Sequence, residues 1–344
     1  MARKKQVLVT GGSGFIAKHI ILALLDEGLS VRASVRNEDR AADVRAAMNT
    51  HARDRETLDA RLTFVELDLT RDEGWDAALD GCSALIHTAS PFPMAQPEDE
   101  DELVRPAVDG TLRAMNAARD AGVTRVILTS STVAVTGTRL PAGRHRYDEN
   151  DWTDVHSAMT TPYAKSKTLA ERAAWSFVRE HPEMKLTSIN PGLVLGPPLD
   201  SRIGTSLELI ERLLAGKDPL VPRLGLPVVD VRDIAQMHVR ALLRDESVGF
   251  RFVGAERFMW MTDLAKVLAA EYPDRRVPTR QAPDWLLRLF AIWDKSIKGI
   301  LPTLGHETPV NSALAAEILG IEFIEARQAI RTSAASLFRE GHVS

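Results

Sequence analysis

The sequence predicts an α/β fold in which a doubly wound parallel sheet is joined to a smaller, mainly helical C-terminal lobe. Three observations support this prediction. Short β-branched runs alternate with amphipathic stretches through the first 190 residues, a glycine-rich turn follows the first run, and the alternation changes at prolines 191, 197 and 198. Strand then helix, repeated, is typical of a parallel sheet with helices on both faces.

The individual elements follow from this pattern in chain order. Buried strands are predicted at 6–9, 30–35, 62–66, 84–87, 123–129 and 186–190, and helices stand out between them at 16–27, 104–121 and 163–179. A later helix is predicted at 205–214, and the run 228–231 is expected to be a strand that returns to the sheet. The predicted helix at 232–243 and the segment 250–253 are expected to belong to the first domain as well. We therefore expect a cofactor-binding domain at 1–190 plus about 228–253, and a substrate-binding lobe at about 191–227 and 255–344.

Composition and charge are those of a globular protein with a sizeable core. The chain has 344 residues, 44% of them hydrophobic, and a formal net charge of −4. Lysines and arginines are scattered among acidic residues, so we expect neither nucleic acid nor a membrane as a partner. The expected partner is a small molecule, and the chain is expected to be a monomer or a homodimer.

The expected location is the cytoplasm. Cys82 is the single cysteine, so no intramolecular disulfide can form, and neither end carries a long apolar run. The nine histidines show no metal-ligand spacing. No metal site is predicted.

A glycine-rich turn directly after the first strand predicts a dinucleotide site. In Thr10-Gly11-Gly12-Ser13-Gly14-Phe15-Ile16-Ala17, Gly11 permits a tight turn and Gly14 permits close approach of the backbone to a pyrophosphate. A small residue, Ala17, allows the helix to pack closely on the sheet, and the N-terminus of that helix faces the phosphates. The candidate cofactor contacts here are Gly11, Gly14, Phe15 and Ile16.

The end of the second strand predicts NADP(H) as the cofactor. An NAD enzyme would carry an acidic residue there to bind the ribose 2′-hydroxyl, but this chain has Ser34-Val35-Arg36. A guanidinium suits a 2′-phosphate, which a carboxylate would repel. Arg36 is therefore the main candidate determinant and Arg40 a second contact, while Arg32 lies at the opposite end of the strand.

Two further strand ends supply candidate cofactor contacts. Asp68-Leu69 follows the third strand, where the aspartate either reaches the adenine or caps a helix. Thr88, Ala89 and Ser90 follow the fourth strand, and their small side chains would let a dinucleotide cross the strand ends. We expect His87 to be a buried strand residue rather than a catalyst.

Hydroxyl groups and a Tyr-x-x-x-Lys pair predict a reductase. Ser130 and Ser131 end the apolar fifth strand, and Tyr163 and Lys167 stand four residues apart on a predicted helix, where Cβ atoms are about 5–6 Å apart. The ammonium would lower the pKa of the phenol, so that tyrosine could pass a proton while a serine stabilises charge on a carbonyl oxygen. Lys167 would also bind the nicotinamide ribose.

Taken together, these motifs resemble the extended short-chain dehydrogenase/reductase family, over about residues 6–253. Within it, the segments 31–36, 88–92 and 190–197 resemble the dihydroflavonol reductase and cinnamoyl-CoA reductase branch, which includes many microbial aldehyde and ketone reductases. The resemblance implies a Rossmann domain that binds NADP(H), with Ser131, Tyr163 and Lys167 as catalytic residues. Ser130 would then be structural.

The same resemblance places Pro191, Gly192, Leu193 and Val194 along the nicotinamide. This chain departs from the family pattern in having Ala17 at the third glycine position, which the branch tolerates. The asparagine of the shorter family members has no clear match, and Asn116 is not assigned its role.

Bulky apolar residues predict the substrate class. Phe92, Met94, Val133 and Leu195 are candidates for the substrate pocket, and Leu193 faces the same region. They favour an uncharged aromatic or aliphatic carbonyl compound over a sugar. The tryptophans of the C-terminal lobe, Trp260, Trp285 and Trp293, either line a wall of this pocket or belong to the core.

Two other functions compete with an NADPH-dependent carbonyl reductase. An NAD-retaining nucleotide-sugar epimerase or dehydratase would use the same serine, tyrosine and lysine, but Arg36 and the missing acidic ribose ligand argue against it. A dinucleotide-sensing regulator would not need Tyr163 and Lys167 in catalytic register.

Overall fold

The computed structural model of the protein describes residues 6–90 and 99–343. Its main sheet has seven parallel strands in the order β3-β2-β1-β4-β5-β6-β9. The strands are β1 (Gln6–Thr10), β2 (Ser30–Val35), β3 (Leu62–Glu66), β4 (Cys82–His87), β5 (Arg125–Thr129), β6 (Lys185–Pro191) and β9 (Arg251–Gly254). The predicted doubly wound fold is confirmed.

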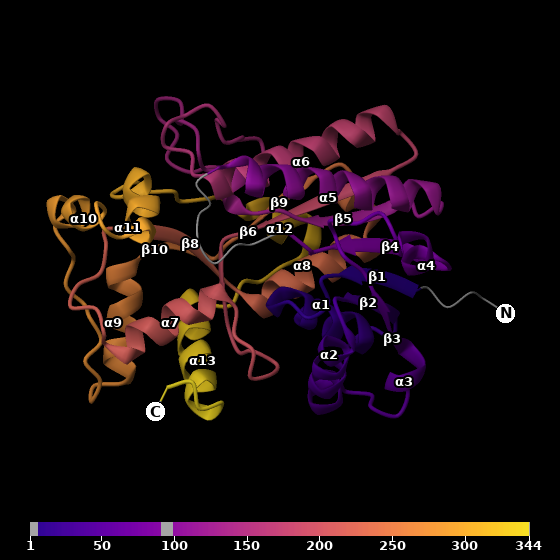
Figure 1. Ribbon diagram of the computed structural model, residues 1–344, viewed down its shortest axis with the longest axis horizontal. Coiled ribbons are helices and arrows are strands. Elements are labelled where there is room, and N and C mark those ends of the chain that lie inside the picture. The colour runs from indigo at the N-terminus through magenta and orange to yellow at the C-terminus, as the bar shows by residue number, and fades with distance from the viewer. Residues whose placement is uncertain (1–5, 91–98, 344) are drawn as a thin grey trace.

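Helices cover both faces of this sheet (Figure 1). One layer contains α1 (Phe15–Asp26), α2 (Glu38–His51), α8 (Val231–Leu243) and α12 (Ala313–Leu319), and the other contains α4 (Trp75–Leu79), α5 (Asp101–Asp120) and α6 (Pro162–Glu180). The short helix α3 (Leu58–Arg61) precedes β3. Side chains alternate across a sheet, so successive residues of one strand pack against different helix layers. In β1, Val7 and Val9 pack against the first layer and Leu8 packs against the second.

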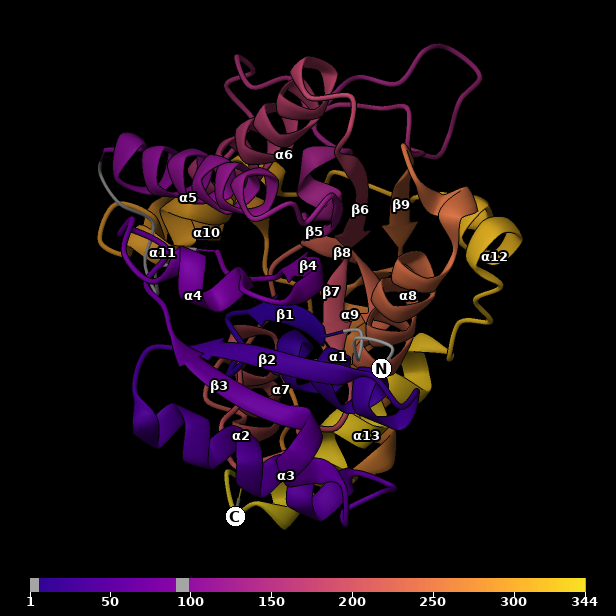
Figure 2. The same cartoon turned by 90° about the vertical axis from the view of Figure 1, so that its right-hand side faces the viewer.

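A second, three-stranded sheet with the order β10-β8-β7 lies beside the main one. Its strands are β7 (Leu193–Leu195), β8 (Gly225–Asp230) and β10 (Arg257–Trp260), and the helices of this lobe are α7 (Thr205–Ala215), α9 (Met261–Glu271), α10 (Asp284–Phe290), α11 (Lys295–Ile300) and α13 (Ala326–Arg339). Figure 2 shows α7 and α13 below the small sheet in the turned view. The core of the lobe joins residues of α7, β8, α9 and α13.

One strand prediction was wrong in its placement. The run at 228–231 does form a strand, β8, but it pairs with β7 and β10 and not with the main sheet. The run at 250–253 corresponds to β9, which pairs with β6 as the last strand of the main sheet. The chain therefore leaves the main sheet after β6, builds part of the lobe, and returns at β9.

The catalytic-helix candidate, α6, begins where its sequence requires. Thr161 accepts a hydrogen bond from the Ala164 N–H over 3.2 Å, and Pro162 occupies the first turn, where it loses no intrahelical hydrogen bond. Helix α6 packs along α5, so both cover the same face of the sheet.

Candidate active site

A cavity of about 810 Å³ lies along the carboxyl ends of the main-sheet strands. The strand order reverses between β1 and β4, and this is the place where ligands bind in open α/β sheets. The cavity wall includes every predicted cofactor contact except one: Gly11, Gly14, Phe15, Ile16, Arg36, Asp68, Leu69, Thr88, Ala89, Ser90, Tyr163, Lys167, Pro191, Gly192 and Val194. The exception is Leu193, which packs against the core of the smaller lobe.

The turn between β1 and α1 has the geometry that a bound pyrophosphate needs. Gly11 has φ +65°, and a Cβ there would lie 3.1 Å from Ala89 Cα. The Gly11 N–H donates to Ser34 Oγ over 3.0 Å, and the Gly14 N–H donates to the Gly11 carbonyl over 2.8 Å. No described side chain caps α1, so its first N–H groups can bind an anion. These residues fit a dinucleotide.

Basic side chains gather at the far end of the cavity. Arg36 is exposed and Arg40 is half-buried, and both border the cavity. Arg202 borders it too, and its Nε lies 2.7 Å from an Asp43 carboxylate oxygen. This end therefore carries the positive charge that a phosphate group on the adenosine ribose would need.

Asp68 shapes the turn in which it lies and also borders the cavity. Its Oδ1 accepts hydrogen bonds from the Thr70 N–H and O–H, each over 2.8 Å. The hydrogen bond from the Thr70 backbone holds the pKa of this carboxyl below its ordinary value, and the Arg36 guanidinium acts in the same direction. Asp68 does not cap a helix, because the N-cap of the next helix, α4, is Gly74. Its carboxylate closes a turn and borders the cavity, and its contact with the adenine stays a prediction.

His87 ends β4 as a buried strand residue, as predicted. Its Nδ1 lies 2.9 Å from Thr10 Oγ1, an atom that also accepts hydrogen bonds from the Thr88 and Ala89 N–H groups. Burial lowers the pKa of His87 to about 3, and the charge of Lys167 lowers it as well. The imidazole is therefore neutral, and it positions the strand end beneath the cavity.

Ser131, Tyr163 and Lys167 meet at the same wall of the cavity. Tyr163 and Lys167 lie one turn apart on α6, and the side chains of Tyr163 and Ser131 are hydrogen-bonded to each other. Ser131 also caps the 3-10 turn at 132–134 by accepting from the Val133 N–H. A hydroxyl pair and an ammonium group thus face one space.

The predicted lowering of the Tyr163 pKa is not found. Burial raises the pKa of the Tyr163 phenol above its ordinary value, the hydrogen bond with Ser131 opposes this, and Lys167 is not among the groups that shift it. Burial also lowers the pKa of Lys167, to about 8, while the Glu171 carboxylate raises it. The spacing alone could not reveal this result, because it depends on how deeply the helix face is buried.

Two residues to which no catalytic role was assigned, Ser130 and Asn116, form hydrogen bonds within the protein. The Ser130 hydroxyl donates to Glu171 Oε2 over 2.6 Å inside the protein, in agreement with the structural role predicted for it. The Asn116 side chain donates to the Leu112 carbonyl of its own helix over 2.9 Å, and Asn116 is not part of the cavity wall.

The sequence analysis missed a segment of the wall. Residues 202–206, which lead into α7, border the cavity opposite the glycine turn. Gly204 is the N-cap of α7, and a Cβ there would lie 3.7 Å from Phe15 Cβ. The signal available in the sequence was a glycine followed by hydroxyl residues at the start of a predicted helix.

The predicted substrate-pocket residues that the structure describes do not border this cavity. Phe92 and Met94 lie outside the described residues. Val133 is not part of the cavity wall, and Leu195 is fully buried in the core of the lobe. Trp260 packs edge-on against Phe258, and Trp285 and Trp293 are 68% and 74% exposed, so these last two belong neither to the core nor to this wall.

Among residues 6–90 and 99–343, no group of three or more His, Cys, Asp or Glu side chains could hold a metal ion. Within these ranges, no helix has the length and apolar character needed to cross a bilayer.

Comparison with known proteins gives consistent results. The model of the NAD dependent epimerase/dehydratase family matches residues 7–251. Cinnamoyl-CoA reductase 1 of Arabidopsis thaliana is 33% identical over 344 residues, covering 99% of this chain and 91% of the relative. An anthocyanidin reductase of Vitis vinifera, described as (2S)-flavan-3-ol-forming, is 32% identical over 290 residues, covering 80% and 83%.

A solved structure is similar along the whole chain. It is the yeast methylglyoxal/isovaleraldehyde reductase Gre2 complexed with NADPH, with a TM-score of 0.79, 26% identity, and coverage of 98% of this chain and 100% of that one.

Proposed function

We propose a function from one premise: the chain belongs to the NAD dependent epimerase/dehydratase family, the extended short-chain dehydrogenases/reductases, and within it to the branch of the cinnamoyl-CoA and dihydroflavonol reductases. The proposed activity is the NADPH-dependent reduction of the carbonyl group of an apolar aldehyde or ketone, with oxidation of the alcohol as the reverse reaction. The observation that carries this proposal is the meeting of Ser131, Tyr163 and Lys167 at the wall of a cavity that also contains Arg36.

The proposed roles follow from the state of each side chain. When bound, NADPH supplies the hydride that adds to the carbonyl carbon. Ser131 and Tyr163 donate hydrogen bonds to the carbonyl oxygen, and Tyr163 gives that oxygen its proton. The raised pKa of the phenol keeps this proton in place at neutral pH, which suits reduction. Lys167 binds the nicotinamide ribose.

Preference for NADP(H) is assigned to Arg36, with Arg40 as a second contact. Arg36 follows β2 directly, at the position where a carboxylate would bind the ribose 2′-hydroxyl of NAD. A guanidinium at this position favours a 2′-phosphate. The same residue argues against a sugar-nucleotide epimerase that retains NAD.

The division of labour between the two parts of the chain is also a proposal. Residues 1–190 and about 228–253 would hold the cofactor, and about 191–227 and 255–344 would choose the substrate. The approach of residues 202–206 to the glycine turn supports a site that is closed by both parts.

The test is turnover by the purified protein. NADPH oxidation would be followed against aromatic and aliphatic aldehydes, ketones, acyl-CoA thioesters and dihydroflavonols, with NADH in parallel. Turnover with NADPH, and much less with NADH, is the expected result. No turnover on any of these compounds, together with NAD that co-purifies with the protein, would instead support the epimerase or dehydratase activity.

A further inference from the structure

A third residue shares the face of α6 that carries Tyr163 and Lys167. Glu171 follows Lys167 by one turn, and residues four apart on a helix lie on the same face. Its side chain is 0% exposed. A buried carboxylate costs free energy unless it is paired and hydrogen-bonded, so its surroundings decide whether it has a role beyond packing.

The Glu171 carboxylate is bound by residues of two strands of the main sheet, β6 and β9, and by the residue that follows β5. Its Oε1 accepts from Ser188 Oγ and Arg251 Nε, each over 2.7 Å, on β6 and β9. Its Oε2 accepts from Ser130 Oγ, after β5, over 2.6 Å and from Asn190 Nδ2, on β6, over 2.7 Å. One side chain thus fixes the depth of α6 against the strand ends.

These partners are neighbours in sequence of the proposed reaction site. Ser130 precedes Ser131, and Asn190 precedes Pro191, which borders the cavity. Asn190 also donates to the Ser131 carbonyl over 3.2 Å. A shift of the carboxylate would therefore change the distance between the helix that carries Tyr163 and the strand end that carries Ser131.

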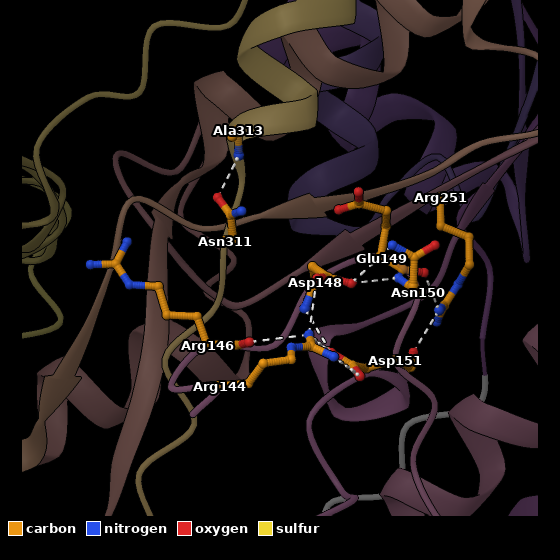
Figure 3. Close-up of polar contacts among 9 residues, drawn as sticks. All are labelled: Arg144, Arg146, Asp148, Glu149, Asn150, Asp151, Arg251, Asn311 and Ala313. Atoms are coloured by element: carbon orange, nitrogen blue, oxygen red, sulfur yellow. Dashed lines mark hydrogen bonds and ion pairs between the residues drawn. The ribbon is translucent and has the colours of Figure 1, made fainter. Parts of the chain in front are cut away.

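Arg251 connects this network to the loop at 144–152, where Figure 3 shows it beside Glu149 and Asp151. Its Nη1 donates to the Glu149 and Asp151 carbonyls over 2.8 and 2.7 Å, and its guanidinium lies 3.6 Å from the centre of the Trp152 ring. The same loop bonds to residues 309–311 through the backbone of Tyr147. The counterion of Glu171 is thus itself held on several sides.

Within residues 6–90 and 99–343, Glu171 is the carboxylate that acts on Lys167. The groups that face Lys167 are Tyr163 and Glu171 of its own helix and His87 of β4. Tyr163 and His87 are neutral, as described above. Burial acts to raise the pKa of Glu171, but Arg251 and the hydrogen bonds outweigh it and hold this pKa below its ordinary value. Glu171 is therefore ionised at neutral pH.

We propose that Glu171 is a positioning residue of the active site: it fixes α6 against the strands that carry Ser131 and Pro191, and it keeps Lys167 in the charged form. This inference rests on the proposed reductase function. Glu171 acts through Lys167 and Tyr163 and does not itself contact the substrate.

The primary experiment is the substitution Glu171→Gln, which removes the negative charge and keeps the shape of the side chain. Isotope-labelled lysine would report the titration of Lys167 by NMR, with the signal assigned by Lys167→Arg. Because the carboxylate raises the pKa of Lys167, its removal should lower this pKa by about one unit or more. With a Lys167 pKa of about 8 lowered by about one unit, the charged fraction falls about twofold at pH 7 and about tenfold at pH 9. The loss in kcat/KM should therefore be about twofold at pH 7, grow to about tenfold at pH 9, and disappear as the pH is lowered.

A purely structural role for Glu171 would lower activity equally at every pH. The matched control is Asp230→Asn, which also removes a fully buried carboxylate that pairs with an arginine and caps a helix, α8. It should destabilise the fold and leave the Lys167 titration unchanged. If Glu171→Gln and Asp230→Asn gave the same unshifted Lys167 titration, the proposal would be overturned.

A second variant covers the case in which Glu171→Gln does not fold, because it leaves Arg251 buried without a counterion. The double change Glu171→Met with Arg251→Met removes both charges, and such replacements are often tolerated. It should show the same Lys167 shift, and an unshifted titration in the folded double variant would contradict the proposal. Since the titration is measured without turnover, a wild-type protein inactive on every carbonyl compound would refute the proposed function alone.

Discussion

At the scale of single residues, Tyr163 carries its proton at neutral pH. Burial raises the pKa of the phenol above 10.0, so the protonated form dominates in the free enzyme. Reduction of a carbonyl requires a proton at the oxygen, and a phenol can deliver one to a substrate that accepts its hydrogen bond. The protonated phenol is therefore in the form that reduction needs, as a proton donor.

Replacing Tyr163 with phenylalanine tests this role. Tyr163→Phe should lower kcat by about 10²- to 10⁴-fold and leave NADPH affinity nearly unchanged, because the hydroxyl acts mainly in the transition state. Steady-state kinetics and a fluorescence titration with NADPH would measure the two quantities. Tyr272→Phe, in the C-terminal lobe, is the matched control and should keep full activity. Comparable kcat values for the two variants would rule out the mechanism.

Arg36 supports a prediction about cofactor choice. Arg36→Ala should weaken NADPH binding by about 1.5–3 kcal/mol, the range for a hydrogen bond to a charged group, and barely affect NADH. Calorimetric titration with both cofactors would measure this difference. Arg53→Ala, at a side chain that is 84% exposed and remote from the cavity wall, should change neither affinity. Equal losses for NADPH and NADH would show that Arg36 does not read the 2′-phosphate.

At the scale of secondary-structure elements, the local sequence pattern predicted whether a segment forms a helix or a strand. It predicted less well which other strand a given strand pairs with. The prediction of a helix at 163–179 agrees with α6 (Pro162–Glu180), because Thr161 and Pro162 mark its start. The apolar run at 228–231 correctly predicted a strand. It could not identify the partner, because a short buried strand has the same composition in either sheet. Pairing was decided by the lobe that forms between β6 and β9.

The junction of the two sheets gives a prediction at this scale. Gly192 links β6 to β7, and a Cβ there would lie 2.3 Å from the Pro227 carbonyl oxygen of β8. Gly192→Ala should therefore separate β7 from β8 and lower the free energy of unfolding by about 1–3 kcal/mol, as overpacking does. Urea denaturation would measure the change.

Gly204→Ala is the control for this substitution. Its Cβ would meet Phe15 Cβ at 3.7 Å, an ordinary contact, and its φ is −94°. Because Gly204 is the N-cap of α7, where alanine is disfavoured, the free energy of unfolding should fall only by the roughly 0.5–1 kcal/mol of a lost cap preference. An equal loss in both variants would show that the contact with Pro227 is not the cause.

At the scale of the whole molecule, the active site combines segments that lie far apart in the sequence. The residues from β1 to α6 could be predicted because each follows a strand end or shares a helix face. The segment 202–206 could not, because its place depends on how the lobe folds back toward the glycine turn. Leu195 was assigned to the pocket for its apolar character, but the same character buried it in the core of the lobe. Hydrophobicity does not tell a core from a pocket.

Buried histidines predict how stability of the whole molecule depends on pH. Burial lowers the pKa values of His19, His87 and His238 to about 4, about 3 and about 4, from 6.5. As the pH falls below 6.5, the unfolded chain binds three protons that the native protein excludes. Burial raises the pKa of Asp233 to about 7, so this group binds one proton in the native state and opposes the trend.

The net effect is a loss of stability on acidification. The free energy of unfolding should fall by about 2 kcal/mol per pH unit at its steepest. Urea denaturation at several pH values between about 7 and 4.5 would measure this dependence. Stability that stayed constant or rose over this range would show that the histidines are not held neutral.

The return of the chain to the main sheet at β9 has a consequence for the order of assembly during translation. Arg251 is made about 80 residues after Glu171, and the ribosome adds roughly 5–20 residues per second. Once β6 has been made, the nascent chain for several seconds holds every strand of the main sheet except β9, and the Glu171 carboxylate of α6 lacks its Arg251 counterion. Closing that helix onto the sheet is therefore expected to be a late event in biogenesis, after the lobe between β6 and β9 has been synthesised.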